Sequence, residues 1–200
     1  MIVFLDCDDA LDVCAAEMGL QRGQVKQLLS PTTTRLRQKE SDEFAIDNGA
    51  FAGIKIERFL YLLEREQEGK HLCKFVVVPD VVGDARRTLE VFQHWKYKLT
   101  GWPLALAIQD GIENLPIPWK FLTAVFIGGT TEFKLSRHAK AVIQAAKAMG
   151  KWVHAGRVNT PGRFEYFEES GADSIDGTGL SRFTHMRAAF QQPVLFSKSA

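Results

Sequence analysis

Short apolar segments alternate with amphipathic segments along most of the chain. Seven segments are rich in β-forming residues, and most of them are apolar nearly throughout, as strands buried on both faces are. These segments are 2–6, 43–47, 75–80, 104–109, 124–129, 151–156 and 172–176. The pattern predicts seven buried β-strands.

Four of the segments between these strands have the spacing of amphipathic helices. The expected helices are 54–69, 84–99, 136–150 and 161–171. The apolar face of the first is expected to contain Ile56, Phe59, Leu60 and Leu63. Asp84 is expected to cap the second helix, Gly150 ends the third, and Pro161 opens the fourth.

Alternation of strand and helix predicts a parallel sheet with right-handed crossovers. Seven or eight such units favour an α/β fold of the (β/α)8 TIM-like barrel type over an open sheet. We expect a single domain over residues 1–200, compact for such a barrel, with segment 193–197 as the candidate eighth strand. Segment 30–42 is polar and threonine-rich and predicts a long loop. Two interpretations of the loop stay open: a solvated loop, or one whose Arg35, Arg37 and Lys39 contact phosphates.

Composition places the chain among ordinary globular proteins. Hydrophobic residues make up 46% and charged residues 24%, and the formal net charge of +1 neither favours nor excludes nucleic acid. No run reaches the roughly 20 apolar residues of a membrane span, and the acidic start is unlike a signal peptide. The cysteines, Cys7, Cys14 and Cys73, have no CxxC spacing. We therefore expect reduced thiols, no cysteine zinc site, no membrane contact and a cytoplasmic location.

Polar residues or glycines follow six of the predicted strands. In a parallel barrel the carboxyl ends of the strands meet at one rim, where active sites form. The residues at these ends are Asp47, Asn48, Gly49, Asp80, Asp84, Gln109, Asp110, Gly128, Gly129, His154, Arg157, Asn159 and Asp176. A single Asp after a strand is usually a turn former or a helix cap, but six such ends predict a shared site.

Four of these residues suit a flat heterocycle. Gly128 and Gly129 leave the backbone bare, so a ring can lie against it. Gln109 offers a donor and an acceptor, and Asp80 offers two acceptor oxygens. Together they predict recognition of a purine-like base.

Asp47 and Asp176 remain as a carboxylate pair. Two acids roughly 5 Å apart can run a retaining displacement at a glycosidic bond. One attacks the anomeric carbon and forms a covalent ester, and the other moves the proton of the leaving group. We expect this chemistry at the rim.

The motifs "IDNGAF", "PDVVGD", "AIQDG", "FIGGTTEFK" and "GADSIDGTGLSRF" resemble, in this order, those of the tRNA-guanine transglycosylases, which insert queuine or archaeosine precursors. The resemblance covers residues 43–183. The segments "VPDVVGDA", "GGTTEFK" and "KWVHAGRVN" look closer to those of the small phage and bacterial relatives that place 7-deazaguanines into DNA.

This resemblance implies a role for each matching residue. Asp176 would be the nucleophile on C1′, and Asp47 the general acid/base. The residues implied for base binding are Asp80, Gln109, Gly128, Gly129, Asn48 and His154. For His154 a second interpretation stays open, namely a buried position in the core. Guanine would leave, and a free 7-deazaguanine such as preQ0 would take its place, with no cofactor and no metal.

The chain departs from the family pattern in three ways. Ala50 stands where the family has a second glycine. No cysteine follows Cys73, so the zinc ligands of the tRNA enzymes are missing, and no appended RNA-binding domain is expected. These departures favour DNA over tRNA as the substrate.

A target base must leave its stack to reach such a pocket, so compensating phosphate contacts are expected. The candidates are Arg157, Arg163, Arg182 and Lys134, together with Arg137 and Arg187. The location would be the cytoplasm of a bacterium or a phage-infected host, and a homodimer stays open.

Other functions stay open at this point. The same exchange on tRNA is one, and a base-binding or nucleic-acid-binding barrel without turnover, acting as a subunit of a complex, is another. A Schiff-base aldolase barrel is disfavoured, because no strand end offers a suitable lysine.

Overall fold

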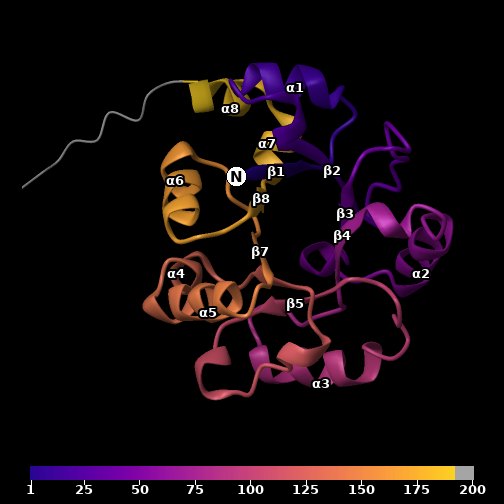
Figure 1. The fold of residues 1–200 in the computed structure, drawn as a ribbon, viewed down its shortest axis with the longest axis vertical. Coiled ribbons are helices and arrows are strands. Elements are labelled where there is room, and N and C mark those ends of the chain that lie inside the picture. Colours follow the sequence, from indigo (N-terminus) through magenta and orange to yellow (C-terminus); the bar gives the residue numbers. More distant parts are fainter. Residues whose placement is uncertain (192–200) are drawn as a thin grey trace, which may run out of the picture.

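A computed structural model describes residues 1–191, and its centre is a closed ring of eight parallel strands in chain order (Figure 1). The strands are β1 (Ile2–Leu5), β2 (Val25–Leu29), β3 (Phe44–Ile46), β4 (Cys73–Val77), β5 (Leu104–Ile108), β6 (Ala124–Ile127), β7 (Trp152–Ala155) and β8 (Ser174–Asp176). Pairing of β1 with β8 closes the ring, with Phe4 opposite Asp176. The predicted (β/α)8 barrel is confirmed.

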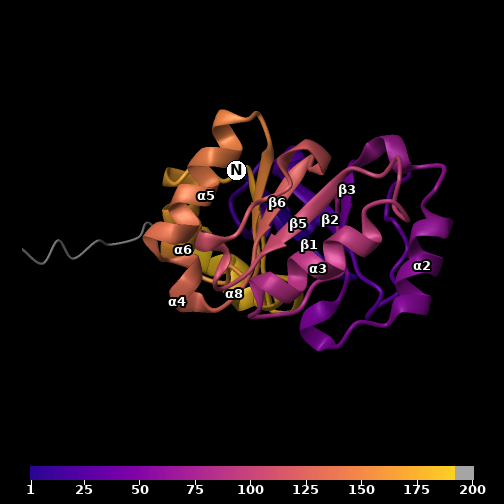
Figure 2. The same ribbon diagram turned by 90° about the horizontal axis from the view of Figure 1, so that it is seen from below.

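Helices lie outside the ring of strands (Figure 2). They are α1 (Leu11–Glu17), α2 (Ile56–Arg65), α3 (Ala85–Trp95), α4 (Thr131–Lys134), α5 (Arg137–Ala148), α6 (Pro161–Glu169), α7 (Thr178–Arg182) and α8 (Thr184–Ala188). All four predicted helices are present, and Asp84 caps α3 by accepting from Arg87 N at 2.9 Å. None of the helices within residues 1–191 is long and apolar enough to cross a bilayer.

The sequence pattern did not predict β2 or α1, nor the short helices α4, α7 and α8. In β2, Lys26 and Gln27 interrupt the apolar pattern. The structure accommodates both, because Lys26 pairs with Glu43 at 2.6 Å and the buried Gln27 donates to the backbone of the following loop. The helix α1 has seven residues and no side-chain cap, so neither terminus gives a signal. The candidate strand 193–197 lies outside the described residues, and the ring closes without it.

The buried face of α2 also differs from the expected one. Phe59, Leu62 and Leu63 are buried, whereas Ile56 and Leu60 are 37% and 45% exposed. The buried face of α2 is therefore rotated toward Leu62 relative to the expected face, and it lies next to buried Glu66.

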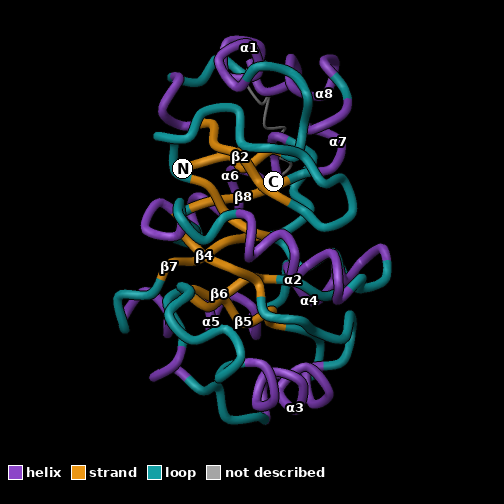
Figure 3. The backbone as a smooth tube through the Cα atoms, turned by 90° about the vertical axis from the view of Figure 1, so that its right-hand side faces the viewer, coloured by secondary structure: helices purple, strands orange, loops and turns teal. Residues whose placement is uncertain are grey.

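Strand alternation separates two cores. Large apolar residues fill the layer between barrel and helices, and a smaller cluster that includes Phe4, Phe75 and Ala107 fills the inside of the barrel. Figure 3 shows the strands crossing the middle of the molecule between helices and loops. Since every second residue points inward, the next inward positions are at the carboxyl rim. These positions are Asp6, Ser30, Asp47, Gln109, Gly128, Gly156 and Asp176.

Candidate active site

A cavity of about 120 Å³ lies at the carboxyl ends of the strands. Seven of the residues selected from the sequence for catalysis and base binding line it, and they come from the ends of β3, β4, β5, β6 and β8. These residues are Asp47, Asn48, Asp80, Gln109, Gly128, Gly129 and Asp176. The rim of the barrel therefore brings together groups that are up to 129 positions apart in the sequence, from Asp47 to Asp176.

The two acids selected as a catalytic pair share this cavity. Burial, and then the charges of Asp176 and Asp80, together raise the pKa of Asp47 from its ordinary value of 3.8 to about 7. The backbone N–H of Gly49 donates to Asp47 Oδ2 at 3.3 Å and acts in the opposite direction. Asp47 can therefore hold a proton near neutral pH, as a general acid must.

Two hydrogen bonds, one from a residue of β7 and one from the loop that follows β7, hold the Asp176 carboxylate. The backbone N–H of Arg157 donates to its Oδ1 at 3.0 Å, and His154 Nε2 lies 3.1 Å from the same oxygen. Within residues 1–191, Oδ2 has no hydrogen-bond partner among the protein groups. One oxygen is thus anchored and the other is available for attack.

A chain of hydrogen bonds orients His154. Trp152 Nε1 donates to Ser174 Oγ at 2.8 Å, and that oxygen lies 2.9 Å from His154 Nδ1. Because indole only donates and a carboxylate only accepts, the chain is complete when the imidazole carries its proton on Nε2. His154 is fully buried among Phe4, Phe75 and Phe126. It does not line the cavity, so its expected role in binding substrate is corrected to one of positioning Asp176.

Asp80 is fixed through both of its oxygens. Asn48 Nδ2 donates to Oδ1 at 2.7 Å, and Gln109 Nε2 donates to Oδ2 at 2.6 Å. Burial raises the pKa of Asp80, while these two bonds lower it. The amide oxygen of Gln109 accepts from Gly83 N at 2.9 Å, and that of Asn48 accepts from Ala50 N at 2.7 Å. Asn48 and Gln109 therefore orient Asp80, which itself lines the cavity.

The glycine wall is present and has a local cause. Gly129 has φ of +77°, and a side chain there would collide with the Asp110 carboxylate, which accepts from Thr130 N at 2.9 Å. Within residues 1–191, the N–H of Gly129 has no acceptor. A Cβ on Gly156, also in the wall, would lie 2.5 Å from the Phe126 ring.

Lys134 was expected on the nucleic-acid surface, and the structure corrects this. It is 3% exposed, lines the cavity from α4, and donates from Nζ to the carbonyl oxygen of Gly156 at 2.7 Å. Burial, and then the nearby charge of Arg157, lower its pKa to about 8. A lysine does therefore lie in the pocket, although none follows a strand directly in the sequence.

Arg157 and Phe51 form one edge of the cavity. The guanidinium lies 3.9 Å from the centre of the Phe51 ring, which is 68% exposed. Arg157 has φ of +58°, a strained left-handed conformation for a residue with a side chain. This conformation directs its N–H at Asp176.

A second cavity of about 380 Å³ adjoins the first and shares Asp47, Phe51, Asp176 and Thr178 with it. Its other lining groups are mostly hydroxyls and charges: Asp6, Ser30, Thr32, Thr33, Arg35, Ser181 and Arg182. The two catalytic candidates therefore lie between a chamber with a glycine wall and a chamber lined with hydroxyls.

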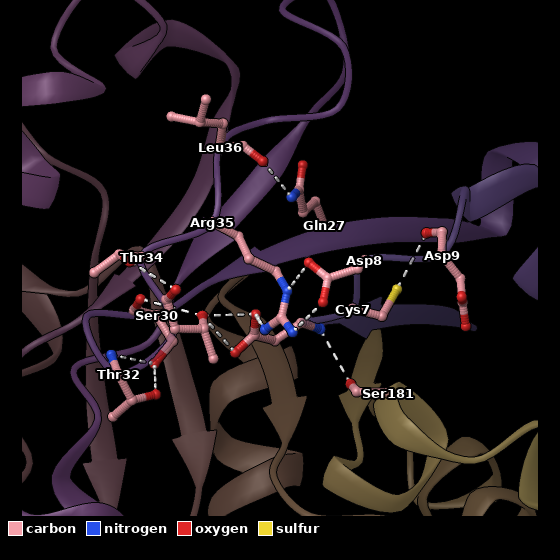
Figure 4. Close-up of polar contacts among 12 residues, drawn as sticks. Cys7, Asp8, Asp9, Gln27, Ser30, Thr32, Thr34, Arg35, Leu36 and Ser181 are labelled. Carbon is pink, nitrogen blue, oxygen red and sulfur yellow. Dashed lines mark hydrogen bonds and ion pairs between the residues drawn. The ribbon is translucent and has the colours of Figure 1, made fainter.

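In this second cavity, acids of the loop after β1 form ion pairs with Arg35. Arg35 makes two bonds to Asp8, at 2.7 and 2.8 Å, and one to Asp6 at 2.7 Å (Figure 4). Thr33 Oγ1 also donates to Asp6, and Ser181 Oγ accepts from the backbone N–H of Asp6. Arg35 is thus paired with two acids of the protein itself, which argues against a role of Arg35 in phosphate binding.

The other two cations of the loop are paired as well. Arg37 bonds buried Glu66 at 2.7 Å, and Lys39 lies 3.6 Å from Asp12. Buried Gln27 accepts from Gln38 N at 2.8 Å and donates to Leu36 O at 2.7 Å, so the predicted loop is anchored to β2.

The remaining arginines divide into surface and core. Arg182 is exposed and lines the second cavity, and Arg163 is partly exposed on α6. Arg137 is exposed at the start of α5 and lines neither cavity. Arg187 is 1% exposed and bonded to Glu17, Asp9 and the Leu180 carbonyl, so its expected phosphate contact is wrong.

The three cysteines are buried free thiols, as expected, and Cys7 Sγ lies 3.8 Å from Cys14 Sγ. Neither a protein-family model nor a curated protein matches the chain.

Proposed function

We propose that the protein exchanges a guanine base in a nucleic acid for a free 7-deazaguanine, by a retaining double displacement. The observation that supports this best is that Asp47 and Asp176 line one cavity, and that burial and the charge of Asp176 raise the pKa of Asp47. A carboxyl group that can hold a proton near neutral pH, beside a second carboxyl group, is what acid–base chemistry at a glycosidic bond requires.

In the first step Asp176 Oδ2 attacks C1′ of the target nucleoside. The bond from C1′ to N9 breaks, and its electron pair leaves with the guanine, which takes the proton held by Asp47. The product is a sugar ester on Asp176, with Asp47 now ionised. The hydrogen bonds from Arg157 N and His154 to Oδ1 keep Oδ2 directed at the sugar.

The second step reverses the first with another base. The N9–H of the incoming 7-deazaguanine gives its proton to Asp47, N9 attacks C1′, and the ester bond to Asp176 breaks. Configuration at C1′ is retained after two inversions, and both acids return to their initial states. The protein groups balance the reaction without a further reactant.

Asp80 supports the choice of guanine. Asn48 and Gln109 hold both of its oxygens, so its free lone pairs can accept the N1–H and the 2-amino group of guanine. The N–H of Gly129 suits the 6-oxo group on the neighbouring edge. Adenine would present an acceptor at N1 to an acceptor on the protein and would be rejected.

The second cavity supports a polymer as the substrate. With the base in the first chamber and C1′ at Asp176, the sugar and its phosphates extend toward Ser30, Ser181 and Arg182. We favour DNA over tRNA, because the segments "VPDVVGDA", "GGTTEFK" and "KWVHAGRVN" resemble those of the relatives that place 7-deazaguanines into DNA.

The test is exchange of radiolabelled guanine into DNA and into tRNA, in separate reactions. We expect incorporation into DNA by the wild-type protein and its loss in Asp176→Asn and Asp47→Asn. Asp84→Asn is the matched control, because Asp84 caps α3 and lines neither cavity. Incorporation only into tRNA would replace DNA as the substrate. Incorporation into neither, or full exchange by Asp176→Asn, would overturn the proposal.

A further inference from the structure

Three segments of the chain carry lysines and aromatic residues but no acid. They are 69–79, 91–109 and 114–131, which contain β4, β5 and β6. These strands are parallel neighbours in the ring, so the residues before them meet at the amino ends of the strands, opposite the candidate active site. We call this face the lysine–aromatic surface, and it consists of Lys70, Lys96, Lys98 and Lys120 with Trp95, Tyr97, Trp102 and Phe121.

Contacts between the segments hold the lysine–aromatic surface together. Lys70 Nζ, before β4, lies 5.1 Å from the centre of the Trp102 ring, before β5. Lys96 Nζ, directly after α3, lies 4.2 Å from the centre of the Phe121 ring, before β6. Tyr97 packs edge-on against the same ring, with 6.2 Å between the ring centres. The surface therefore spans the amino ends of three neighbouring strands.

Acids of the protein do not neutralise these lysines. The lysines that form ion pairs within residues 1–191 are others, namely Lys26, Lys39, Lys74 and Lys147. The lysines of the surface lie against aromatic rings instead: Lys120 Nζ is 4.9 Å from the centre of Phe121, and Lys98 Nζ is 5.0 Å from that of Trp95. An aromatic ring attracts an ammonium group without removing its charge, and the group keeps N–H donors for an anion. A chain of net charge +1 thus concentrates positive charge on one face.

Tyr97 adds an exposed aromatic ring to this charge. It is 68% exposed and stands between Lys96 and Lys98 in the sequence. An exposed ring can stack on an unpaired base, whatever the base is, because every base has a π-face. In a duplex these faces are covered by the neighbouring base pairs. Lysines beside a stacking ring therefore fit a single strand of nucleic acid better than a duplex.

We propose that the lysine–aromatic surface binds single-stranded nucleic acid, with its lysines on the phosphates and Tyr97 stacked on a base. None of its residues, all of which the structure describes, lines either cavity of the candidate active site. The inference goes beyond the proposed function, because it requires neither guanine nor exchange. The surface would hold a segment of nucleic acid remote from the nucleotide that reacts.

The test measures binding of a fluorescent oligothymidine of about 15 nucleotides by fluorescence anisotropy, over a range of salt concentrations. This probe contains no guanine, so it reports on the surface whether or not the protein exchanges bases. Each phosphate neutralised on a single strand contributes about 0.7 to the slope of log affinity against log salt. The double variant Lys96→Gln/Lys120→Gln should therefore lower this slope by about 1.4 and weaken binding at moderate salt.

Two matched controls separate the surface from overall charge and from exposed aromatic area. Arg58→Gln/Lys140→Gln removes the same charge from exposed positions of α2 and α5 and should leave the affinity and the slope nearly unchanged. Tyr97→Ala should weaken binding about 5- to 150-fold, the loss of one stacked base. Tyr61→Ala removes a tyrosine of α2 that is 62% exposed and should bind as the wild-type protein does.

Cross-linking of the wild-type protein locates the contact without any variant. A single-stranded oligonucleotide that carries 5-iodouracil should attach, on irradiation, to the peptide that contains Tyr97. Attachment only to peptides at the two cavities, or equal loss of binding in each variant and its control, would overturn the proposal. Polyglutamate that competes as well as oligothymidine would also overturn it and indicate an acidic protein as the partner. Absence of guanine exchange while oligothymidine binds as described would contradict the proposed function alone.

Discussion

His154 Nε2 lies 3.1 Å from Asp176 Oδ1, inside the barrel and outside the cavity. The phenyl ring in His154→Phe conserves much of the volume and removes this bond. Loss of one hydrogen bond to a charged group costs about 1.5–3 kcal/mol, so we expect kcat to fall about 10- to 150-fold, with KM for the base nearly unchanged. Steady-state exchange kinetics measure both constants.

Trp152→Phe is the control for this variant. It removes the far end of the chain, the bond from Trp152 Nε1 to Ser174, and leaves the contact between His154 and Asp176 intact. An equal loss of kcat in both variants would mean that packing, and not the orientation of Asp176, explains the effect.

The pH dependence of exchange should report Asp47. Its pKa of about 7 means that the proton needed by leaving guanine is present below this pH and lost above it. We expect kcat for release of guanine to fall about 10-fold per pH unit above pH 7. In Asp47→Asn the residual rate should no longer fall with pH above pH 7. If the rate of this variant still falls, another group is responsible for the pH dependence.

The same rise in the pKa of Asp47 means that its ionised carboxylate lowers the free energy of unfolding. Between pH 3.8 and about 7 the folded protein retains a proton on Asp47 that the unfolded chain has lost. The contribution of Asp47 to the free energy of unfolding therefore falls as the pH rises through this interval and stays low above it. Asp47→Asn should be more stable than the wild-type protein at pH 8, by up to about 4 kcal/mol, and the difference should disappear near pH 4. Urea unfolding at both pH values measures it.

The left-handed backbone of Arg157 can be tested with two small residues. Both Arg157→Gly and Arg157→Ala lose the contact with Phe51 and keep the N–H that binds Asp176. Alanine keeps the strain at φ of +58° and glycine relieves it, so the glycine variant should be more stable by about 1 kcal/mol. Thermal unfolding of the two variants compares them, and greater stability of the alanine variant would contradict a strained site.

Arg187 should affect stability and not binding. It is 1% exposed and joins α8 to Glu17 of α1 and to Asp9. Arg187→Ala should lower the free energy of unfolding by about 3–5 kcal/mol, because two carboxylates lose their partner. Arg182→Ala, at the exposed edge of the second cavity, should instead weaken binding to DNA with little change in melting temperature. The opposite pattern would restore Arg187 as a phosphate ligand.

Strand ends could be predicted from the sequence because of how a parallel barrel is built. Once the apolar segments are placed, the residues after them share one rim, which is why Asp47, Asp80 and Asp176 were found. The same rule applied to the first strand would have selected Asp6, which lines the second cavity. Burial raises the pKa of Asp6, although its bond to Arg35 lowers it.

Two features of the site could not be predicted in this way. Lys134 enters the cavity from α4, seven residues after the last residue of β6, so its direction depends on the turn at Gly129. Arg187 and Arg182 are five residues apart, and only packing against α1 decides that one is buried and the other exposed. Charge alone does not distinguish a phosphate ligand from a structural ion pair.

The central claim is a covalent sugar ester on one carboxylate, and its most direct measurement is peptide mass spectrometry of the protein quenched in denaturant after incubation with a guanine-containing oligonucleotide. We predict that the wild-type protein carries the oligonucleotide, less one guanine, on the peptide that contains Asp176, and that excess free guanine reverses the adduct. Attachment at another residue, or the same adduct in Asp176→Asn, would contradict the account.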